Sequence, residues 1–329
     1  MRSGTRRRLA LARRPDLFII GAAKCGTTSL YEYLRGHPEV YMSPAKEPRY
    51  FSRDLVSGSP HDFRYGQDLE RYLALFKEAR DEKRLGEASV RYIYSEDAPR
   101  LIHEFQPRPY IVAMLRNPVD MMYSMHNQRL SEGREEFSDF EQALAAEKDR
   151  LEGRGLPSGV APALTVYRPR ARFGEQLPRW FETFGSERMH VIIFEDFVRD
   201  PATHFRQLLE FLEVDPSYQP ESFSAYNRSH APRFRFIRQI TNARIPQLLV
   251  WRLLPAVAGD RVTRSIVRGY RNSPLNRRSA PRQPLRPELR RQLELEFADD
   301  VARVSELLGR DLAALWWKRA GAITAQGDV

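Results

Sequence analysis

Short apolar runs alternate with segments of helical spacing along most of this chain. Four runs of five or six residues have the composition of buried parallel strands, at 17–21, 85–90, 110–115 and 189–194. Apolar residues recur with helical spacing at 30–34, 137–146, 173–184 and 202–212. Strands that alternate with helices predict an open α/β sheet with right-handed crossovers, in which ligands bind at the C-terminal ends of the strands.

The C-terminal part of the chain carries a longer apolar stripe. Its members recur every three or four positions, at Leu289, Leu293, Phe297, Val301, Val304 and Leu308. This spacing predicts one helix with a face toward the core, and Gly309 is suited to end it. The preceding segment, 232–287, is rich in Pro and Arg and contains the apolar run 245–254, and its pattern gives it no place on the sheet.

Length and composition indicate a folded globular protein. The 329 residues are 42% hydrophobic, which suffices for one large domain or two small ones. The single cysteine excludes an internal disulfide framework and fits a reducing compartment, so we expect a cytoplasmic protein. No apolar run reaches the roughly 18–20 residues of a membrane-spanning helix. Residues 1–14 hold six Arg without the apolar stretch of a secretory signal, which predicts a disordered basic arm before a single domain over 15–329.

The net charge of +10 is concentrated in two segments. One is the arm at 1–14, and the other is 233–282, which holds twelve Arg against Asp260 alone, so the rest of the chain is mildly acidic. Clustered positive charge favours an anionic partner, such as a nucleotide, an acidic acceptor, a membrane surface or nucleic acid. A solvated basic face explains the same pattern equally well.

The segment after the first apolar run has the form of a phosphate-binding loop. A buried strand, a Gly-rich turn and a helix start would point backbone N–H groups and the helix dipole at an anion. Gly21 and Gly26 keep the spacing of an ATP-type P-loop, but Thr27 stands where that motif has lysine. The lysine lies inside the loop instead, as Lys24, which suggests a nucleotide other than ATP.

Several motifs, in this order along the chain, resemble the sulfotransferases that use PAPS (3′-phosphoadenosine 5′-phosphosulfate). The loop at 21–30 is similar to their 5′-phosphosulfate loop, and Arg116 with Ser124 is similar to their 3′-phosphate site. Further matches are the His-Pro pair at 37–38 and the segments 46–51, 194–197 and 308–312. The resemblance runs from about residue 15 to residue 317 and points to the heparan-sulfotransferase-like branch, which includes bacterial members. It implies a P-loop NTPase-like fold, an open parallel sheet flanked by helices on both faces.

The resemblance also implies PAPS as the donor, no metal, and transfer to a hydroxyl or amine of a carbohydrate or small metabolite. Lys24 would stabilise the charge that grows on the bridging and leaving oxygens. Arg116 and Ser124 would clamp the 3′-phosphate, although a structural ion pair and an ordinary helix serine are the simpler alternatives. The 5′-phosphate would lie against the loop residues Cys25, Gly26, Thr27, Thr28 and Ser29. Among these, Cys25 is expected to serve only as a spacer.

Glu47 is the candidate general base, because a glutamate in this Lys-Glu segment has that role in the resembling branch. A solvated Lys–Glu pair on a loop is the alternative. His37 and His126 compete as bases, since other sulfotransferase branches use histidine. The residues expected to contact the acceptor are Lys46, Arg49, Ser89, Tyr92 and His126, although core packing explains Tyr92 equally well.

Tyr226, Arg228 and Arg233 resemble a late loop that closes over the 3′-phosphate and adenine, but the family's Lys-Gly-Arg spelling is missing here. The basic segment 232–287 would then be a lid over the acceptor or a docking surface.

Two other classes of function stay open at this point. A nucleotide kinase or NTPase with an aberrant loop would turn over ATP with magnesium, and the missing loop lysine disfavours it. A basic binding protein would lose affinity steeply with salt. Nucleic acid is the less favoured partner for it, and the run 245–254 flanked by Arg allows peripheral membrane contact.

Overall fold

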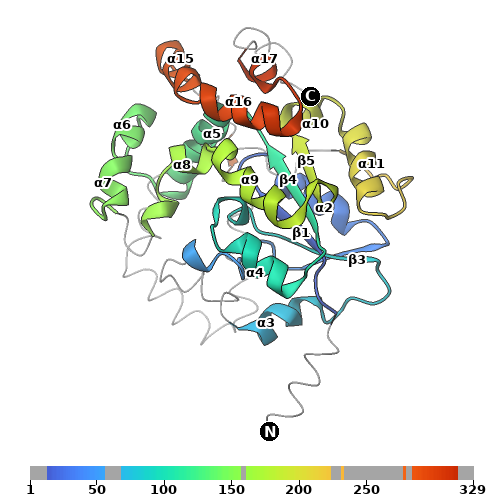
Figure 1. The fold of residues 1–329 in the computed structure, drawn as a ribbon. Coiled ribbons are helices and arrows are strands. Elements are labelled where there is room, and N and C mark those ends of the chain that lie inside the picture. The colour runs from blue at the N-terminus through green and yellow to red at the C-terminus, as the bar shows by residue number, and fades with distance from the viewer. Residues whose placement is uncertain are drawn as a thin grey trace.

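A parallel sheet of five strands lies at the centre of the molecule, in the order β2-β3-β1-β4-β5 (Figure 1). The computed structural model describes residues 13–55, 68–156, 161–223, 231–232, 277–278 and 284–317. The strands are β1 (Leu17–Gly21), β2 (Val40–Met42), β3 (Arg84–Ala88), β4 (Tyr110–Leu115) and β5 (Met189–Ile193). Every residue of β1 and β4 is buried, as expected for central strands covered on both faces.

The strand predictions are largely confirmed. β1 and β4 have the predicted bounds, whereas β3 ends two residues early and β5 ends at Ile193 because Phe194 already begins a helix. The short edge strand β2 was not predicted. Its three residues, Val-Tyr-Met, are too few to give a pattern, and the middle one is only partly buried.

Helices cover both faces of the sheet (Figure 1). One face carries α4 (Ala98–Phe105) and α9 (Phe173–Phe184), against which α16 (Ala298–Leu308) packs. The other carries α2 (Thr27–Arg35), α10 (Phe194–Arg199) and α11 (Pro201–Phe211), joined by aromatic contacts of Tyr33 with Phe197 and Phe205. A right-handed crossover places its helix on one face or the other according to the direction in which the chain moves across the sheet. The connection from β1 to β2 runs in one direction, whereas the connections from β3 to β4 and from β4 to β5 run in the other, so their helices lie on opposite faces.

The remaining elements are short or lie at the ends of the sheet. The α-helices are α3 (Leu69–Leu73), α5 (Pro118–Glu132), α6 (Phe140–Ala145), α7 (Glu147–Leu151), α8 (Arg168–Ala171), α15 (Pro287–Glu296) and α17 (Leu312–Trp316). The 3-10 helices are η1 (Arg53–Leu55), η2 (Ala74–Phe76), η3 (Tyr92–Tyr94), η4 (Pro162–Leu164) and η5 (Ser186–Arg188). A two-residue antiparallel pair joins β6 (Ala231–Pro232) and β7 (Arg277–Arg278).

The helix predictions are confirmed at 173–184 and, with shifted ends, elsewhere. The helix expected at 137–146 begins only at Phe140, because the Asp139 side chain accepts from the Gln142 N–H and caps it there. The helix expected at 202–212 begins one residue earlier, at Pro201, a favoured residue for a first helical position.

The prediction of one C-terminal helix is wrong. The stripe lies on two helices, α15 and α16, which meet at Phe297. The backbone of Phe297 (φ −96°, ψ 2°) leaves the helical region, yet its side chain stays fully buried, so the apolar spacing continues across the break. Gly309 ends α16 in the left-handed conformation (φ 61°), as predicted.

The predicted arm and the Arg-rich segment fall mainly outside the described residues. Of the arm, only Arg13 and Arg14 are described. The Arg13 guanidinium donates to the carbonyls of Arg80 and Glu82, and Arg14 donates to the Phe105 carbonyl at 3.1 Å. Residues 233–276 and 279–283 lie outside the described part.

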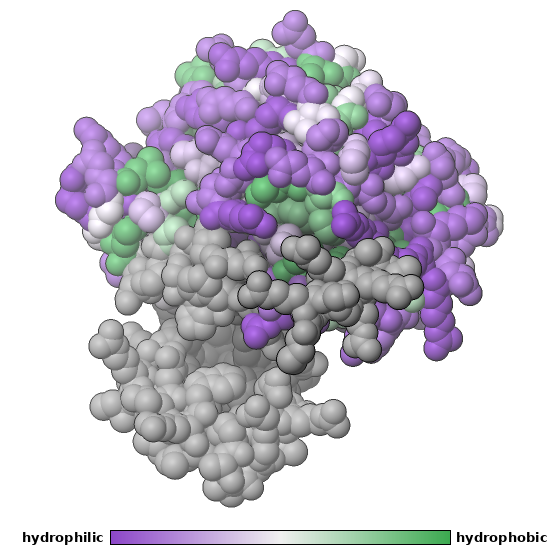
Figure 2. Space-filling model, turned by 60° about the horizontal axis from the view of Figure 1, so that its bottom comes forward, coloured by the Kyte–Doolittle hydropathy of each residue, from purple (hydrophilic) through white to green (hydrophobic). Residues whose placement is uncertain are grey.

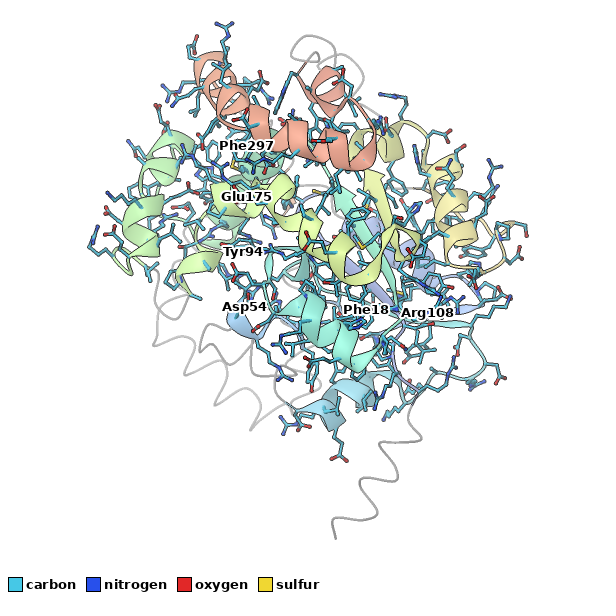
Figure 3. The ribbon with its side chains drawn as sticks, in the orientation of Figure 1. Phe18, Asp54, Tyr94, Arg108, Glu175 and Phe297 are labelled. Carbon is cyan, nitrogen blue, oxygen red and sulfur yellow. The ribbon has the colours of Figure 1, made fainter. Side chains whose placement is uncertain are left out.

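The core packs around the sheet, and polar residues cover most of the described surface in Figure 2, with hydrophobic ones gathered near the centre of that face. Phe18 of β1, labelled in Figure 3, is fully buried and packs edge-on against Phe51 with ring centroids 5.8 Å apart. Trp180 of α9 is also fully buried. Within the described residues, no helix is both long enough and apolar enough to span a bilayer.

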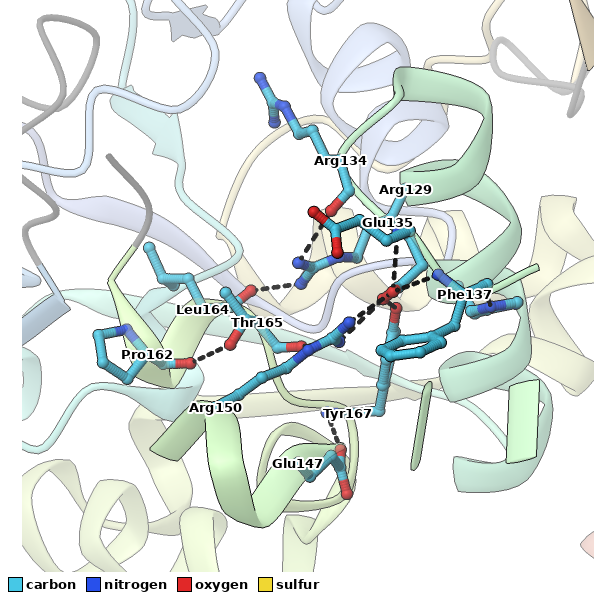
Figure 4. Close-up of polar contacts among 12 residues, drawn as sticks. Arg129, Arg134, Glu135, Phe137, Glu147, Arg150, Pro162, Leu164, Thr165 and Tyr167 are labelled. Carbon is cyan, nitrogen blue, oxygen red and sulfur yellow. Dashed lines mark hydrogen bonds and ion pairs between the residues drawn. The ribbon is translucent and has the colours of Figure 1, made fainter. Parts of the chain in front are cut away.

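A buried ion pair joins the segment after α5 to α7 (Figure 4). The Arg150 guanidinium contacts the Glu135 carboxylate, and their side chains are 3% and 0% exposed. Tyr167 donates its hydroxyl to the same carboxylate, and Arg150 also donates to the Thr165 carbonyl at 3.1 Å. These hydrogen bonds lower the pKa of Glu135 to about 2 against the opposing effect of burial. The pair therefore stays ionised and fixes this helical region to the rest of the fold.

Candidate active site

Two glycines shape the loop between β1 and α2. At Gly21 (φ +154°) a Cβ atom would lie 2.5 Å from the Ile93 side chain, and at Gly26 (φ +89°) it would lie 3.1 Å from the Phe194 ring. Only glycine suits both the backbone angles and the space at these positions. The loop is therefore wedged between η3 and the start of α10.

Lys24 sits in this loop with a left-handed backbone (φ 67°) and a half-buried side chain. Its carbonyl accepts from the Arg116 guanidinium at 3.4 Å, and the Ala22 N–H donates to the Met114 carbonyl at 2.7 Å. These bonds tie the loop to β4 at the C-terminal edge of the sheet. Because β3 and β4 flank β1 on opposite sides, this edge is the switch point at which open α/β sheets bind ligands.

Cys25 is buried within the loop, and its thiol donates to the Ala23 carbonyl. Burial raises the pKa of this thiol far above its ordinary value, so the group stays protonated at neutral pH. The residue fills space in the loop, in keeping with its expected role as a spacer.

The first turn of α2 directs backbone N–H groups toward the same edge. Gly26 is the N-cap and contributes no capping side chain, and no acidic residue lies in the first turn of the helix. Thr27 is buried, whereas Thr28 and Ser29 are half-buried. N–H groups at a helix start, together with the helix dipole, favour an anion at this place.

Arg116 directly follows β4 beside the loop. Its guanidinium carbon lies 4.7 Å from the centroid of the Phe194 ring, which holds the planar group in place. Its Nε atom is buried and has no hydrogen-bond partner within the described residues. A buried guanidinium nitrogen without an acceptor is costly, so the position suits contact with an anionic ligand.

Hydrogen bonds fix the turn that follows Arg116. The Asn117 side chain caps α5 by accepting from the first backbone N–H groups of the helix, and its Nδ2 donates to the Trp316 carbonyl at 2.9 Å. Glu195 accepts from the Asn117 N–H at 3.1 Å and from the Trp316 indole at 3.0 Å. Glu195 therefore braces the turn, and Ser124 lies buried two turns into α5.

Glu47 lies on a turn beside the end of β3. Its N–H donates to the Ala88 carbonyl at 2.9 Å, and its Oε2 accepts from the Val90 N–H at 3.2 Å. The Ser89 N–H in turn donates to the Ile19 carbonyl of β1 at 3.0 Å. Glu47 and the loop of Lys24 thus lie at the same edge of the sheet, beside the ends of the neighbouring strands β3 and β1.

Two cations flank the Glu47 carboxylate. Lys46 Nζ lies 2.9 Å from Oε1, and Arg49 Nε lies 3.7 Å from Oε2. The three side chains are 22%, 20% and 18% exposed for Lys46, Arg49 and Glu47. The carboxylate is thus ion-paired yet still reachable from solvent, as a base that meets an external acceptor must be.

The sequence profile of one family, described as "Sulfotransferase domain", matches residues 14–230. The chain belongs to this family. That range contains the loop of Lys24, the Glu47 turn and Arg116, so the family assignment covers the whole edge of the sheet described above.

Known sulfotransferases are similar to this chain. Human carbohydrate sulfotransferase 15 is 25% identical over 61% of this chain and 44% of its own length. Mouse heparan sulfate glucosamine 3-O-sulfotransferase 6 is 29% identical over 61% and 52%. The chain thus spans about half the length of these relatives. The crystal structure of a sulfotransferase from Alicyclobacillus acidocaldarius superposes with a TM-score of 0.69 at 29% identity, covering 93% of this chain and all of that one.

Two of the residues expected to contact the acceptor lie beneath the surface of the protein. Ser89 and Tyr92 are 0% exposed, and both hydroxyls donate to the Glu87 carboxylate. Neither side chain reaches the surface formed by the described residues, and core packing, the alternative given for Tyr92, agrees with its burial. From the sequence, Glu87 was considered only as part of the lining of the acceptor cleft together with Ser89 and Tyr92, so its bonds to both hydroxyls were missed. The available signal was a lone charged residue within the run 85–90.

The two candidate histidines are also buried. His126 is 1% exposed on α5, where Nε2 lies 2.9 Å from the Phe137 carbonyl, and burial lowers its pKa. His37 is 2% exposed, with Nε2 3.0 Å from the Asp215 carbonyl, and its Nδ1 accepts from the Glu39 N–H. The structure therefore brings neither ring to the edge where Glu47 is exposed.

The remaining predicted residues, Tyr226, Arg228 and Arg233, lie outside the described part of the chain. No group of three or more His, Cys, Asp or Glu residues with metal-binding geometry occurs among the described residues.

Proposed function

We propose that this sulfotransferase moves a sulfuryl group from PAPS to a hydroxyl or amine of a carbohydrate. The observation that carries the proposal is that Lys24, in the loop after β1, and Glu47, bonded to the end of the adjacent strand β3, lie at one edge of the sheet. Transfer requires a site for the donor's anionic groups on one side of the migrating sulfuryl group and a base on the other side. This edge of the sheet offers both. The names of the relatives, a carbohydrate sulfotransferase and a heparan sulfate sulfotransferase, support a carbohydrate acceptor.

The donor would bind through its two phosphate groups. The N–H groups at the start of α2 and the hydroxyls of Thr28 and Ser29 suit the 5′-phosphate. The Nε of Arg116, for which the described residues supply no hydrogen-bond partner, suits the 3′-phosphate, and Ser124 of α5 lies eight residues further along the chain. A nucleotide with a 3′-phosphate would therefore use a contact that ATP and ADP cannot make.

Transfer would then need charge stabilisation and one proton acceptor. Glu47 accepts the proton of the acceptor hydroxyl or amine while the new bond to sulfur forms. The bond between sulfur and the bridging phosphate oxygen breaks, and its electron pair stays on that oxygen. Lys24 lies in the loop where the resulting negative charge would develop. The products are the sulfated acceptor and adenosine 3′,5′-bisphosphate.

Calorimetric titration with adenosine 3′,5′-bisphosphate and with ADP tests the donor site. We expect the bisphosphate to bind about tenfold tighter or more, because one charge-assisted contact supplies that difference. Arg116→Ala should remove the preference, whereas the control Arg206→Ala, at an exposed position of α11, should keep it. Equal affinities in the wild type, or tighter binding of ADP, would contradict the proposal.

A further inference from the structure

A carboxylate with no exposed surface lies beneath the Glu47 turn. Glu87 of β3 is 0% exposed and accepts three hydrogen bonds from hydroxyl groups. The donors are Tyr72 at 3.1 Å, Ser89 at 2.8 Å and Tyr92 at 2.7 Å. A buried acid needs such partners, but three hydroxyl donors on one carboxylate call for a further explanation.

Two of these hydroxyls also hold the backbone of the turn. The Arg49 N–H donates to Ser89 Oγ at 2.9 Å, and the Phe51 N–H donates to Tyr92 Oη at 3.3 Å. A hydroxyl has one hydrogen and two lone pairs. Because that hydrogen is directed to Glu87 in both residues, their lone pairs are left for the two backbone N–H groups.

The turn needs this support because its backbone is unusual. Glu47 and Arg49 both have left-handed angles, φ 66° and 59°, which residues other than glycine seldom adopt. Such angles persist only where the surroundings fix them. A second anchor lies further along, where Asp54 accepts from the Glu96 N–H at 2.9 Å; Figure 3 shows Asp54 close to Tyr94 of η3.

We propose that Glu87 is a positioning residue that acts on Glu47 through the turn. Its carboxylate orients the Ser89 and Tyr92 hydroxyls so that their lone pairs receive the Arg49 and Phe51 N–H groups. The turn is thereby held in the one conformation that presents Glu47 to the acceptor. The inference rests on the proposed function, since it assigns Glu87 to the base of that reaction.

The substitution Glu87→Gln separates this role from space filling. The glutamine has nearly the same shape, but its amide N–H₂ group donates and therefore needs an acceptor. If Ser89 or Tyr92 accepts from the amide, its own hydrogen turns away from residue 87 and its lone pairs change direction. The bond from that hydroxyl to the backbone N–H group of the turn is then weakened, although the core volume is unchanged.

The experiment compares Glu87→Gln and Ser89→Ala with a matched control, Tyr72→Phe. The Tyr72 hydroxyl also donates to Glu87 but has no bond to the turn. We expect the first two variants to lower kcat about tenfold or more while the affinity for adenosine 3′,5′-bisphosphate stays within twofold. Tyr72→Phe should keep kcat within twofold. Unchanged kcat in Ser89→Ala, or an equal loss in Tyr72→Phe, would overturn the proposal.

Hydrogen exchange of the Arg49 and Phe51 amides gives a readout that does not require transfer. We expect faster exchange at these amides in Glu87→Gln and Ser89→Ala, with protection retained in Tyr72→Phe. Unchanged protection in both test variants would overturn the positioning role. If the wild type transfers nothing from PAPS while the exchange result is as expected, the proposed function fails and the structural role of Glu87 stands. If Glu87→Gln does not fold, Ser89→Ala carries the comparison.

Discussion

The Glu87 carboxyl holds its proton to a higher pH than an ordinary glutamate does. Burial raises its pKa to about 7 from 4.5, and the nearby Glu47 charge acts in the same direction, while the hydrogen bonds from Tyr92, Ser89 and Tyr72 oppose the shift. A pKa that folding raises means that the folded state favours the protonated form. This contribution to stability is complete below about pH 4.5 and is lost as the pH rises through about 7.

Glu87→Gln should remove this pH dependence. Between pH 4 and pH 8, the unfolding free energy of the wild type should fall by about 3 kcal/mol relative to that of the variant. Urea unfolding of both proteins at several pH values measures the difference. A difference that stays constant across this range would show that Glu87 titrates alike in the folded and unfolded chain.

Residues in one contiguous motif could be predicted from the sequence, whereas Glu87 could not. The loop with Gly21, Lys24 and Gly26 keeps its chemistry within six positions, so spacing alone points to an anion site. The partners of Glu87 come from α3 and from the segment after β3, and only the folded chain brings Tyr72 to it. The burial of Ser89 and Tyr92 was hidden for the same reason.

At the scale of elements, α5 links the donor site to the C-terminal helix. Asn117 caps α5, follows Arg116 directly and bonds to the Trp316 carbonyl of α17. The cap therefore fixes the first residue of α5 and, through the turn, the position of the Arg116 side chain at the end of β4. A change at this cap should affect both stability and nucleotide binding.

Asn117→Ala should lower the unfolding free energy by about 1–2 kcal/mol, the usual cost of an N-cap. It should also weaken binding of adenosine 3′,5′-bisphosphate severalfold, because the Arg116 turn loses its support. The control Asp139→Ala removes the cap of α6, away from the loop, and should lower stability alone. Denaturant unfolding and calorimetry measure the two effects, and bisphosphate affinity unchanged by Asn117→Ala would contradict this link.

Element boundaries were the least predictable feature. The apolar stripe at 289–308 continues from α15 into α16 because Phe297 stays in the core while its backbone turns, and side-chain spacing does not record that turn. β2 has only three residues and lies at the edge of the sheet, so pairing with β3 rather than its own pattern decides that it forms.

At the scale of the whole molecule, the order of the strands creates the site. β1 lies between β3 and β4, so the ends of these three strands bring together residues that are far apart in the sequence, Lys24, Glu47 and Arg116. The alternation of strands and helices predicted the α/β class, and the resemblance supplied the P-loop-like arrangement. Run lengths alone could not give the strand order, because all the central strands are similarly apolar.

The most direct test of the account is transfer of labelled sulfate from PAPS to a carbohydrate acceptor, measured in single turnovers for the wild type, Lys24→Ala and Lys148→Ala. Lys148 is an exposed lysine on α7 and serves as the control for loss of one positive charge. The account predicts transfer by the wild type and the control, and a rate at least about a hundredfold lower for Lys24→Ala. Wild-type rates in a folded Lys24→Ala protein would contradict it.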